Sequence, residues 1–345
     1  MPSLPKPKLL AALVAVTALL ALPAVAQATL TYVKNPLKPA VYLAADDGSR
    51  SIKWVDGRTP HLSPSGEWLT YLREGPGHAQ EMVLMSLHHL EAPTVMLGWR
   101  DTSLFAFSPD SKTIAALRGP ELGKRKLVLI DALTGFQRAI AIGYFSGFSF
   151  SPDSTEIVYS VAGSEKYPPK SNIYTAPVGG GDAVQLTRDG ISQAPLWGPS
   201  GKIVFVKQLG AKQRKYGPKN ELFLMNGNGT QQKRLTHTEV GPLLTGLTPT
   251  EWSTDGRRLL AEFGGQDTSY AVTVNPRTGA QRPLDKMGDG EQGFVGTALS
   301  GDGSTVLGST GGFEPGPDHR VATIPYGGGK VTTLVKGGFE PDWSR

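Results

Sequence analysis

Cysteine is absent from the 345 residues of this sequence. Disulfide bonds, thiolate metal ligands and lipid attachment at a cysteine are therefore excluded. An excess of charge is also lacking, because the formal net charge is +5 and falls to +3 without Lys6 and Lys8. So small a positive balance does not indicate a nucleic-acid partner, and no recognised nucleic-acid-binding module is present.

The usual catalytic signatures are missing as well. No G-x-S-x-G motif occurs, and no segment of α/β-hydrolase size follows the repeats described below. Glycine-rich turns such as residues 179–181 are not followed by a helical pattern, so they do not predict phosphate loops. We therefore expect no enzyme, no cofactor and no metal site.

The N-terminus has the order of a secretory signal peptide. Lys6 and Lys8 precede an uncharged apolar run over residues 9–22, which is followed by Pro23 and by small residues ending at Ala28. The run is shorter than the roughly 20 residues that span a bilayer. We expect residues 1–28 to be cleaved after Ala28, giving a secreted or periplasmic, cell-envelope protein with no stable membrane span. An uncleaved anchor is the alternative.

A strand-turn-strand motif recurs along the rest of the chain. It is plainest as FSFSPDSTEIVY at residues 148–159, FAFSPDSKTIAA at 105–116 and HLSPSGEWLTY at 61–71. Degenerate copies lie at 196–205, 251–260 and 298–307, and a truncated one at 342–344. We define the residue before each tight turn as the marker residue. The markers are Ser63, Ser108, Ser151, Gly198, Ser253, Ser300 and Ser344.

The marker spacings are 45, 43, 47, 55, 47 and 44 residues. A period in the forties with several short strands is typical of a β-propeller blade. In the copy that begins near Phe148, strands are predicted over 148–151, 156–160, 172–176 and 183–187. The Asp of each Ser-Pro-Asp turn, as in Asp110 and Asp153, is expected to be structural because it repeats.

The two ends of the chain complement each other. Residues 30–33, 40–45 and 51–55 predict three strands without a preceding inner strand, whereas 339–345 predicts an inner strand with nothing after it. Residues 29–345 are therefore predicted to form a single all-β domain, a seven-bladed β-propeller. Its composite blade takes three N-terminal strands and one C-terminal strand, which removes two exposed sheet edges.

The repeats also resemble a known family. The Ser-Pro-Asp turns are followed by NIYTAPVGGG at 172–181 with QLT at 185–187, and by ELFLMNGNGT at 221–230 with RLT at 234–236. These blades look like the Pro-Asp, WD-like propeller repeats of the TolB family over nearly the whole chain. The resemblance implies a propeller scaffold and a protein-binding role in the cell envelope. TolB propellers have six blades, so six blades are the alternative to seven.

The long loops predict a binding surface. Strands of a blade alternate in direction, so the second-to-third loops and the connections between blades share one face, and their lengths vary most. One of these loops, residues 207–219, has five cations and no acid. We expect this face to bind an acidic protein segment or an anionic envelope component; a merely solvated loop is the alternative. The candidate binding residues are Lys207, Lys212, Arg214, Lys215, Tyr216, Lys219, Lys166, Lys170 and Arg125.

A propeller enzyme, either a lyase or a hydrolase, is the alternative function. His61, His78, His237 and His319 are predicted on or near the long-loop face, and imidazole suits a general base or a metal ligand. They come from different blades without ligand spacing on one element. The leading hypothesis is thus a non-enzymatic, monomeric binding scaffold.

Overall fold

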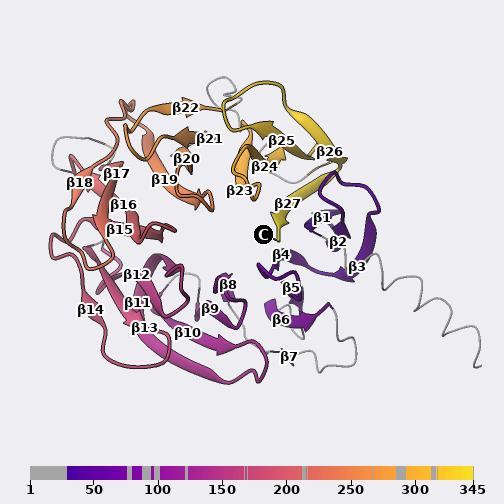
Figure 1. The fold of residues 1–345 in the computed structure, drawn as a ribbon, viewed down its shortest axis with the longest axis horizontal. Coiled ribbons are helices and arrows are strands. Elements are labelled where there is room, and N and C mark those ends of the chain that lie inside the picture. Colours follow the sequence, from indigo (N-terminus) through magenta and orange to yellow (C-terminus); the bar gives the residue numbers. More distant parts are fainter. Residues whose placement is uncertain are drawn as a thin grey trace, which may run out of the picture.

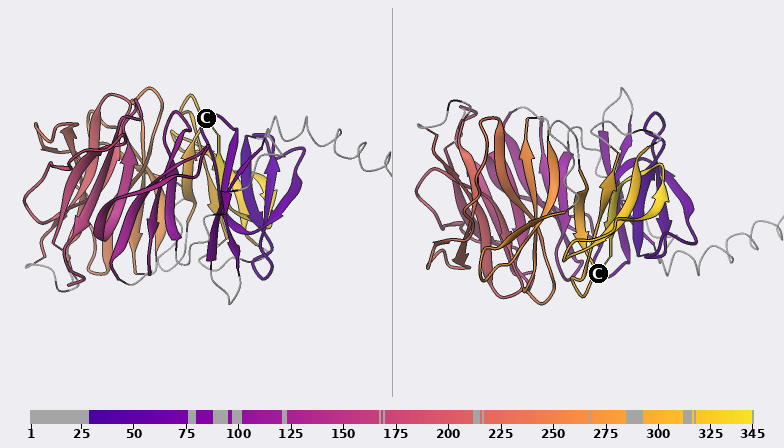
Figure 2. Two further views of the ribbon diagram at one scale, coloured as in Figure 1. Left: turned by 90° about the horizontal axis from the view of Figure 1, so that it is seen from below. Right: turned by 90° about the horizontal axis from the view of Figure 1, so that it is seen from above.

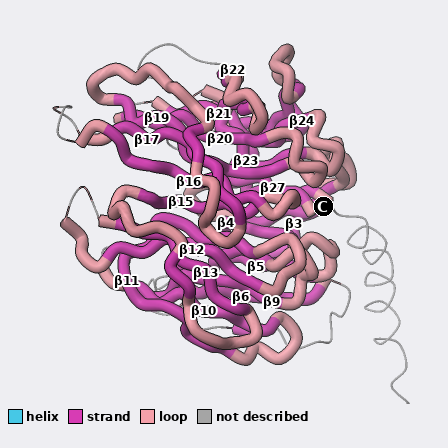
Figure 3. The backbone as a smooth tube through the Cα atoms, turned by 60° about the vertical axis from the view of Figure 1, so that its left-hand side comes forward, coloured by secondary structure: helices cyan, strands magenta, loops and turns pink. Residues whose placement is uncertain are grey.

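The computed structural model describes most of the chain after residue 28. The described residues are 29–75, 80–87, 95–96, 102–120, 123–166, 168, 170–211, 215, 217–266, 268–284, 293–311, 316 and 318–344. They form strands and turns without any helix (Figure 3), so none of them belongs to a helix that could cross a membrane. The predicted signal peptide lies outside these residues, as do His78, Lys212, Arg214 and Tyr216.

The described strands form five sheets, which surround a common axis (Figure 1). Both chain ends contribute to one of them, in the order β27 (Gly338–Trp343), β1 (Leu30–Lys34), β2 (Ala40–Ala44), β3 (Ile52–Asp56). The next contains β4 (Arg58–Leu62), β5 (Trp68–Glu74), β6 (Gln80–Ser86) and β7 (Val95–Met96). A further four-stranded sheet contains β23 (Val295–Leu299), β24 (Thr305–Thr310), β25 (Arg320–Pro325) and β26 (Thr332–Lys336).

Each of the two larger sheets contains two consecutive four-strand groups, and in the first sheet one long strand belongs to both groups. The first runs through β8 (Thr102–Phe107), β9 (Thr113–Arg118), β10 (Arg125–Asp131), β11 (Gln137–Phe150), β12 (Glu156–Ala162), β13 (Ser171–Pro177) and β14 (Val184–Gln185). The second contains β15 (Ser192–Trp197), β16 (Lys202–Leu209), β17 (Lys219–Asn226), β18 (Lys233–Arg234), β19 (Leu244–Trp252), β20 (Leu259–Gly265), β21 (Ser269–Val274) and β22 (Gln281–Pro283).

Strand β11 differs from the sequence prediction. Its first half pairs with β10 as an outer strand, and its second half pairs with β12 as an inner strand. The sequence pattern predicts that the inner strand begins at residue 148. The chain instead stays extended for 14 residues, because residues 137–150 contain no proline and only two glycines.

The pairing predicted between the chain ends is present. Strand β27 lies antiparallel to β1, with Leu30 opposite Trp343 and Thr31 opposite Asp342. Apolar side chains of this sheet pack on β23–β25 on one side and on β5 and β6 on the other. The sheet built from both ends therefore lies between the other two four-stranded sheets (Figure 1), and Figure 2 shows the same ring of sheets edge-on.

Side-chain hydrogen bonds explain the recurring turn. Ser151 donates its hydroxyl to Asp153 Oδ1 at 2.6 Å and accepts the amide of Glu156 at 2.9 Å. The same pair of bonds recurs at Ser108, Ser253 and Ser300. Hydrogen bonds from Ser300 and Ser304 lower the pKa of Asp302 to about 2. The repeated aspartates are thus held by their own turns.

The first strand of every four-strand group is bulged a few residues before its marker. Thr59, Ala194 and Glu340 each lie four residues before a marker and have φ values of 51°, 46° and 49°. Bulges bend a strand and redirect its side chains. Their recurrence at one position supports the repeat assignment independently of the turn motif.

Neighbouring groups are joined at equivalent positions of their first strands. The residue two before the marker accepts a hydrogen bond from the amide one before the next group's marker. Ser149 accepts from Trp197 at 2.7 Å, and Asp342 accepts from Leu62 at 3.0 Å. Glu251 accepts from Leu299 in the same way. We call these three bonds the inter-strand ties.

Candidate functional site

The antiparallel pairing places all second-to-third loops on one face, which we call the long-loop face. The opposite tight-turn face carries the marker turns and the third-to-outer turns. The predicted binding cations belong to the long-loop face. Those that the structure describes fall into two sets, which differ in their contacts.

Three of the predicted cations are engaged within the protein. Lys207 forms an ion pair with Asp189, Nζ to Oδ2 at 2.8 Å, and its ammonium lies over the ring of Phe223 at 5.0 Å. Arg125 donates to the carbonyl of Phe145 at 3.2 Å. Lys219, described next, is the third. These contacts hold connections between strands, so a structural role accounts for all three.

Lys219 belongs to a buried network around Glu221, whose side chain has no exposed surface. Glu221 Oε1 lies 2.9 Å from both Lys219 Nζ and Arg234 Nη2, and the carboxylate accepts bonds from Thr236 and Thr238. Burial would raise the pKa of Glu221, but the hydrogen bonds outweigh it and lower the pKa. Such a network fixes β17 against β18.

The other described cations are exposed. Lys166 and Lys170 lie on the β12–β13 loop and Lys215 on the β16–β17 loop. Gly190, in the connection that carries Asp189, lies close to Lys170. The sequence therefore identified a loop without acids, but missed two acids from other segments, Asp189 and Glu221. Asp189 follows the Gln-Leu-Thr segment and Glu221 lies within β17, and nothing in the sequence signalled that either acid would pair with these cations.

A hollow on the long-loop face escaped the sequence interpretation. It has a volume of about 690 Å³ and lies between the sheet built from both ends and the β4–β7 sheet. The side chain of Leu37, in the β1–β2 loop, lines it and is 97% exposed. The remaining lining residues are Pro36, Lys38, Pro39, Val55, Asp56, Gly57, Arg58, Tyr71, Leu72, Arg73, Glu74 and Gln80.

At the centre of the ring, His61 contacts the C-terminal strand. Its Nδ1 lies 3.5 Å from Asp342 Oδ2, and its ring packs edge-on against Phe105 at 5.0 Å. Burial disfavours the charged imidazole, but Asp342 and Glu340 outweigh this and raise the pKa of His61. Glu340 also accepts the amide of Thr59 at 2.6 Å. Both acids therefore bind backbone of the adjacent strand β4.

The other histidines do not gather around His61 in the described part of the chain. His319 accepts a hydrogen bond from Gly316 at 3.0 Å and packs on Phe339, whereas His237 is exposed beyond β18. His78 lies outside the described residues. Among those described, no three side chains of the metal-ligating types come together. Within the described part of the chain, the His61–Asp342 pair is the imidazole–carboxylate contact at the ring centre.

Comparison with solved structures shows the fold. TolB from Acinetobacter baumannii is 15% identical, with a TM-score of 0.55 over 91% of this chain and 82% of TolB. The propeller domain of the trilobed protease from Pyrococcus furiosus is 14% identical, with a TM-score of 0.61 over 90% of this chain and 97% of that domain.

An enzyme is among the similar structures too. Oligogalacturonate lyase from Vibrio parahaemolyticus is 16% identical, with a TM-score of 0.57 over 90% of this chain and 87% of the lyase. No protein-family model matches the sequence, and no curated protein matches it either. The chain is thus an all-β protein with a β-propeller scaffold, and these identities are too low to carry a function with the fold.

Proposed function

We propose that the chain is an exported, non-enzymatic, seven-bladed β-propeller that binds a protein or an anionic envelope component through its long-loop face. The composite blade of β27 and β1–β3 closes the ring, and the mature domain is a monomer. Export rests on residues 1–28 and their predicted cleavage after Ala28. The similarity to TolB supports the protein-binding role.

The observation that carries the proposal is the position of the exposed groups. Lys166, Lys170 and Lys215 share the long-loop face with the hollow around Leu37. An exposed leucine beside a hollow can bury apolar area in a partner, and the exposed cations elsewhere on the same face favour an acidic partner. The tight-turn face, in contrast, is built largely from side chains held by their own turns.

Affinity capture with the mature domain tests this function. Wild type is compared with a variant carrying Lys212→Gln, Arg214→Gln and Lys215→Gln, and with Leu37→Asp. The matched control is Lys112→Gln, Arg257→Gln and Lys330→Gln, three exposed cations on the tight-turn face. We expect an envelope partner to be retained by wild type and control and lost by the other two. Equal capture by all four proteins would refute binding through the long-loop face.

A propeller lyase is the second candidate, favoured by the His61–Asp342 pair at the ring centre and by the similarity to oligogalacturonate lyase. In that case His61 would act as a general base. Incubation with oligogalacturonate and detection of the unsaturated product by its ultraviolet absorbance tests this role. Turnover that disappears in His61→Ala would replace the binding proposal with this one.

A further inference from the structure

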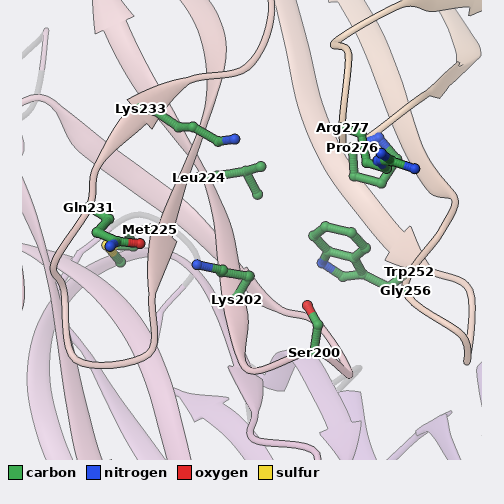
Figure 4. Close-up of a pocket in the computed structure, with 10 residues that line it drawn as sticks. All are labelled: Ser200, Lys202, Leu224, Met225, Gln231, Lys233, Trp252, Gly256, Pro276 and Arg277. Carbon is green, nitrogen blue, oxygen red and sulfur yellow. The ribbon is translucent and has the colours of Figure 1, made fainter.

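The tight-turn face carries a second pocket, distinct from the long-loop face. It has a volume of about 420 Å³, within the range of about 300–1,000 Å³ usual for ligand sites. It lies between two neighbouring four-strand groups, β15–β18 and β19–β22. Its lining residues are Ser200, Lys202, Leu224, Met225, Gln231, Lys233, Trp252, Gly256, Pro276 and Arg277 (Figure 4).

A departure from the repeat shapes the floor of this pocket. Six of the markers are serines, but here the marker is Gly198. A Cβ atom at Gly198 would lie 2.8 Å from Cε2 of Trp252. The missing side chain therefore lets the Trp252 ring lie across the junction, where its Nε1 donates to the carbonyl of Leu196 at 3.3 Å. Trp252 is only 6% exposed, so its position is fixed by packing.

The charges around the pocket have one sign. Lys202, Lys233 and Arg277 line it, and none of the ten lining residues is an acid. Lys202 donates to the side-chain carbonyl of Asn226. Lys233 and Arg277 are exposed, and neither forms an ion pair within the described residues. Figure 4 shows Lys233 and Trp252 directed toward the space around Leu224.

We propose that this pocket binds carboxylate groups carried on short aliphatic chains. The methylene groups would contact Leu224, Met225 and Pro276. One carboxylate would accept charge-assisted hydrogen bonds from Lys233 on one side of the pocket, and a second from the planar guanidinium of Arg277 on the other side (Figure 4). Two sources share this chemistry, the acidic side chains of a peptide segment and a free dicarboxylate. The site is independent of the function proposed for the long-loop face.

Calorimetric titration of the full mature domain tests the pocket. The probes are the peptide acetyl-Ala-Glu-Glu-Ala-amide, its Gln-Gln analogue, and glutarate. Wild type is compared with the double variant Lys233→Gln, Arg277→Gln, and with Arg257→Gln, an exposed cation on the same face outside the pocket. Because all three replaced side chains are exposed, the variants are expected to fold as wild type does.

We expect wild type and Arg257→Gln to bind the acidic peptide at least about tenfold more tightly than its Gln analogue. This preference should shrink in high salt and vanish in the double variant. Binding of glutarate as strong as that of the peptide would identify a free dicarboxylate as the source; binding of the peptide alone would identify a protein segment. Equal affinity for the two peptides, or an unchanged double variant, overturns the proposal.

Discussion

His61 Nδ1 lies 3.5 Å from Asp342 Oδ2, so strand β4 contacts the C-terminal strand β27 through a side-chain pair. The same carboxylate accepts the amide of Leu62 at 3.0 Å. Asp342 therefore binds both a side chain and the backbone of β4. These contacts hold β4 against β27.

The pair predicts a pH dependence of stability. The pKa of His61 is raised in the folded protein by Asp342 and Glu340, against the effect of burial. The stabilisation is therefore fully present below the unfolded pKa of about 6.5 and is lost as pH rises through the folded pKa. We expect the melting temperature of wild type, relative to Asp342→Asn, to be higher at pH 5.5 than at pH 8.5.

The variant Asp342→Asn suits this comparison because its amide oxygen can still accept the Leu62 amide. Melting curves followed by circular dichroism at both pH values provide the measurement. A difference between wild type and variant that is the same at both pH values would show that the His61 charge does not contribute.

Removing one of the inter-strand ties should lower the stability of the fold. Ser149→Ala leaves the amide of Trp197 without its 2.7 Å partner. We expect the free energy of unfolding to fall by about 1 kcal/mol, because a partly buried donor is left unsatisfied. The control is Ser164→Ala in the exposed β12–β13 loop, where the change should stay within about 0.5 kcal/mol. If urea unfolding gives the same change in the free energy of unfolding for both substitutions, the hydrogen bond of Ser149 does not stabilise the fold.

These ties show how far the sequence could predict the fold. The strand order and the turns followed from the repeated motif and its spacing, and the pairing of the two ends followed from their incomplete sets of strands. The ties involve Ser149, Glu251 and Asp342, which all precede a marker by two residues. That recurrence was available in the sequence, but three different residue types concealed it. The strand bulges could not be predicted, because Thr59, Ala194 and Glu340 share no side-chain chemistry.

The divided set of cations leads to a third prediction. Lys219 pairs with the buried carboxylate of Glu221 and donates to the carbonyl of Thr238 at 2.8 Å, whereas Lys215 is exposed. Lys219→Ala should lower the free energy of unfolding by about 1–3 kcal/mol. Lys215→Ala should change it by less than about 0.5 kcal/mol. Chemical unfolding measures both, and a larger loss for Lys215→Ala would contradict the assignment.

The contacts of the candidate binding cations were harder to predict than the fold. A cationic loop is visible in the sequence, but the acids that neutralise part of it come from other segments. Asp189 reaches Lys207 only through the folded connection between β14 and β15. Likewise the exposed Leu37 becomes a candidate contact only when a hollow forms beside it.

A side chain at the marker Gly198 should clash with the Trp252 ring. Gly198→Ala would place a Cβ atom 2.8 Å from the Trp252 ring, which is enclosed at the junction. We expect a loss of about 1–3 kcal/mol from overpacking. Gly163→Ala is the control, because a Cβ atom there meets no atom within 4 Å. Thermal unfolding of both variants checks this, and a neutral Gly198→Ala would mean that Trp252 moves freely.

The account depends most directly on closure of the ring by β27. The test is the melting temperature of the mature domain ending at residue 337, compared with the domain ending at residue 345. Removal of β27 exposes Leu30 and Tyr32 of β1 and deletes the buried Phe339. We predict a fall of more than about 10 °C or loss of cooperative unfolding. A melting temperature within about 2 °C of the full domain would contradict closure and the seven-bladed ring built on it.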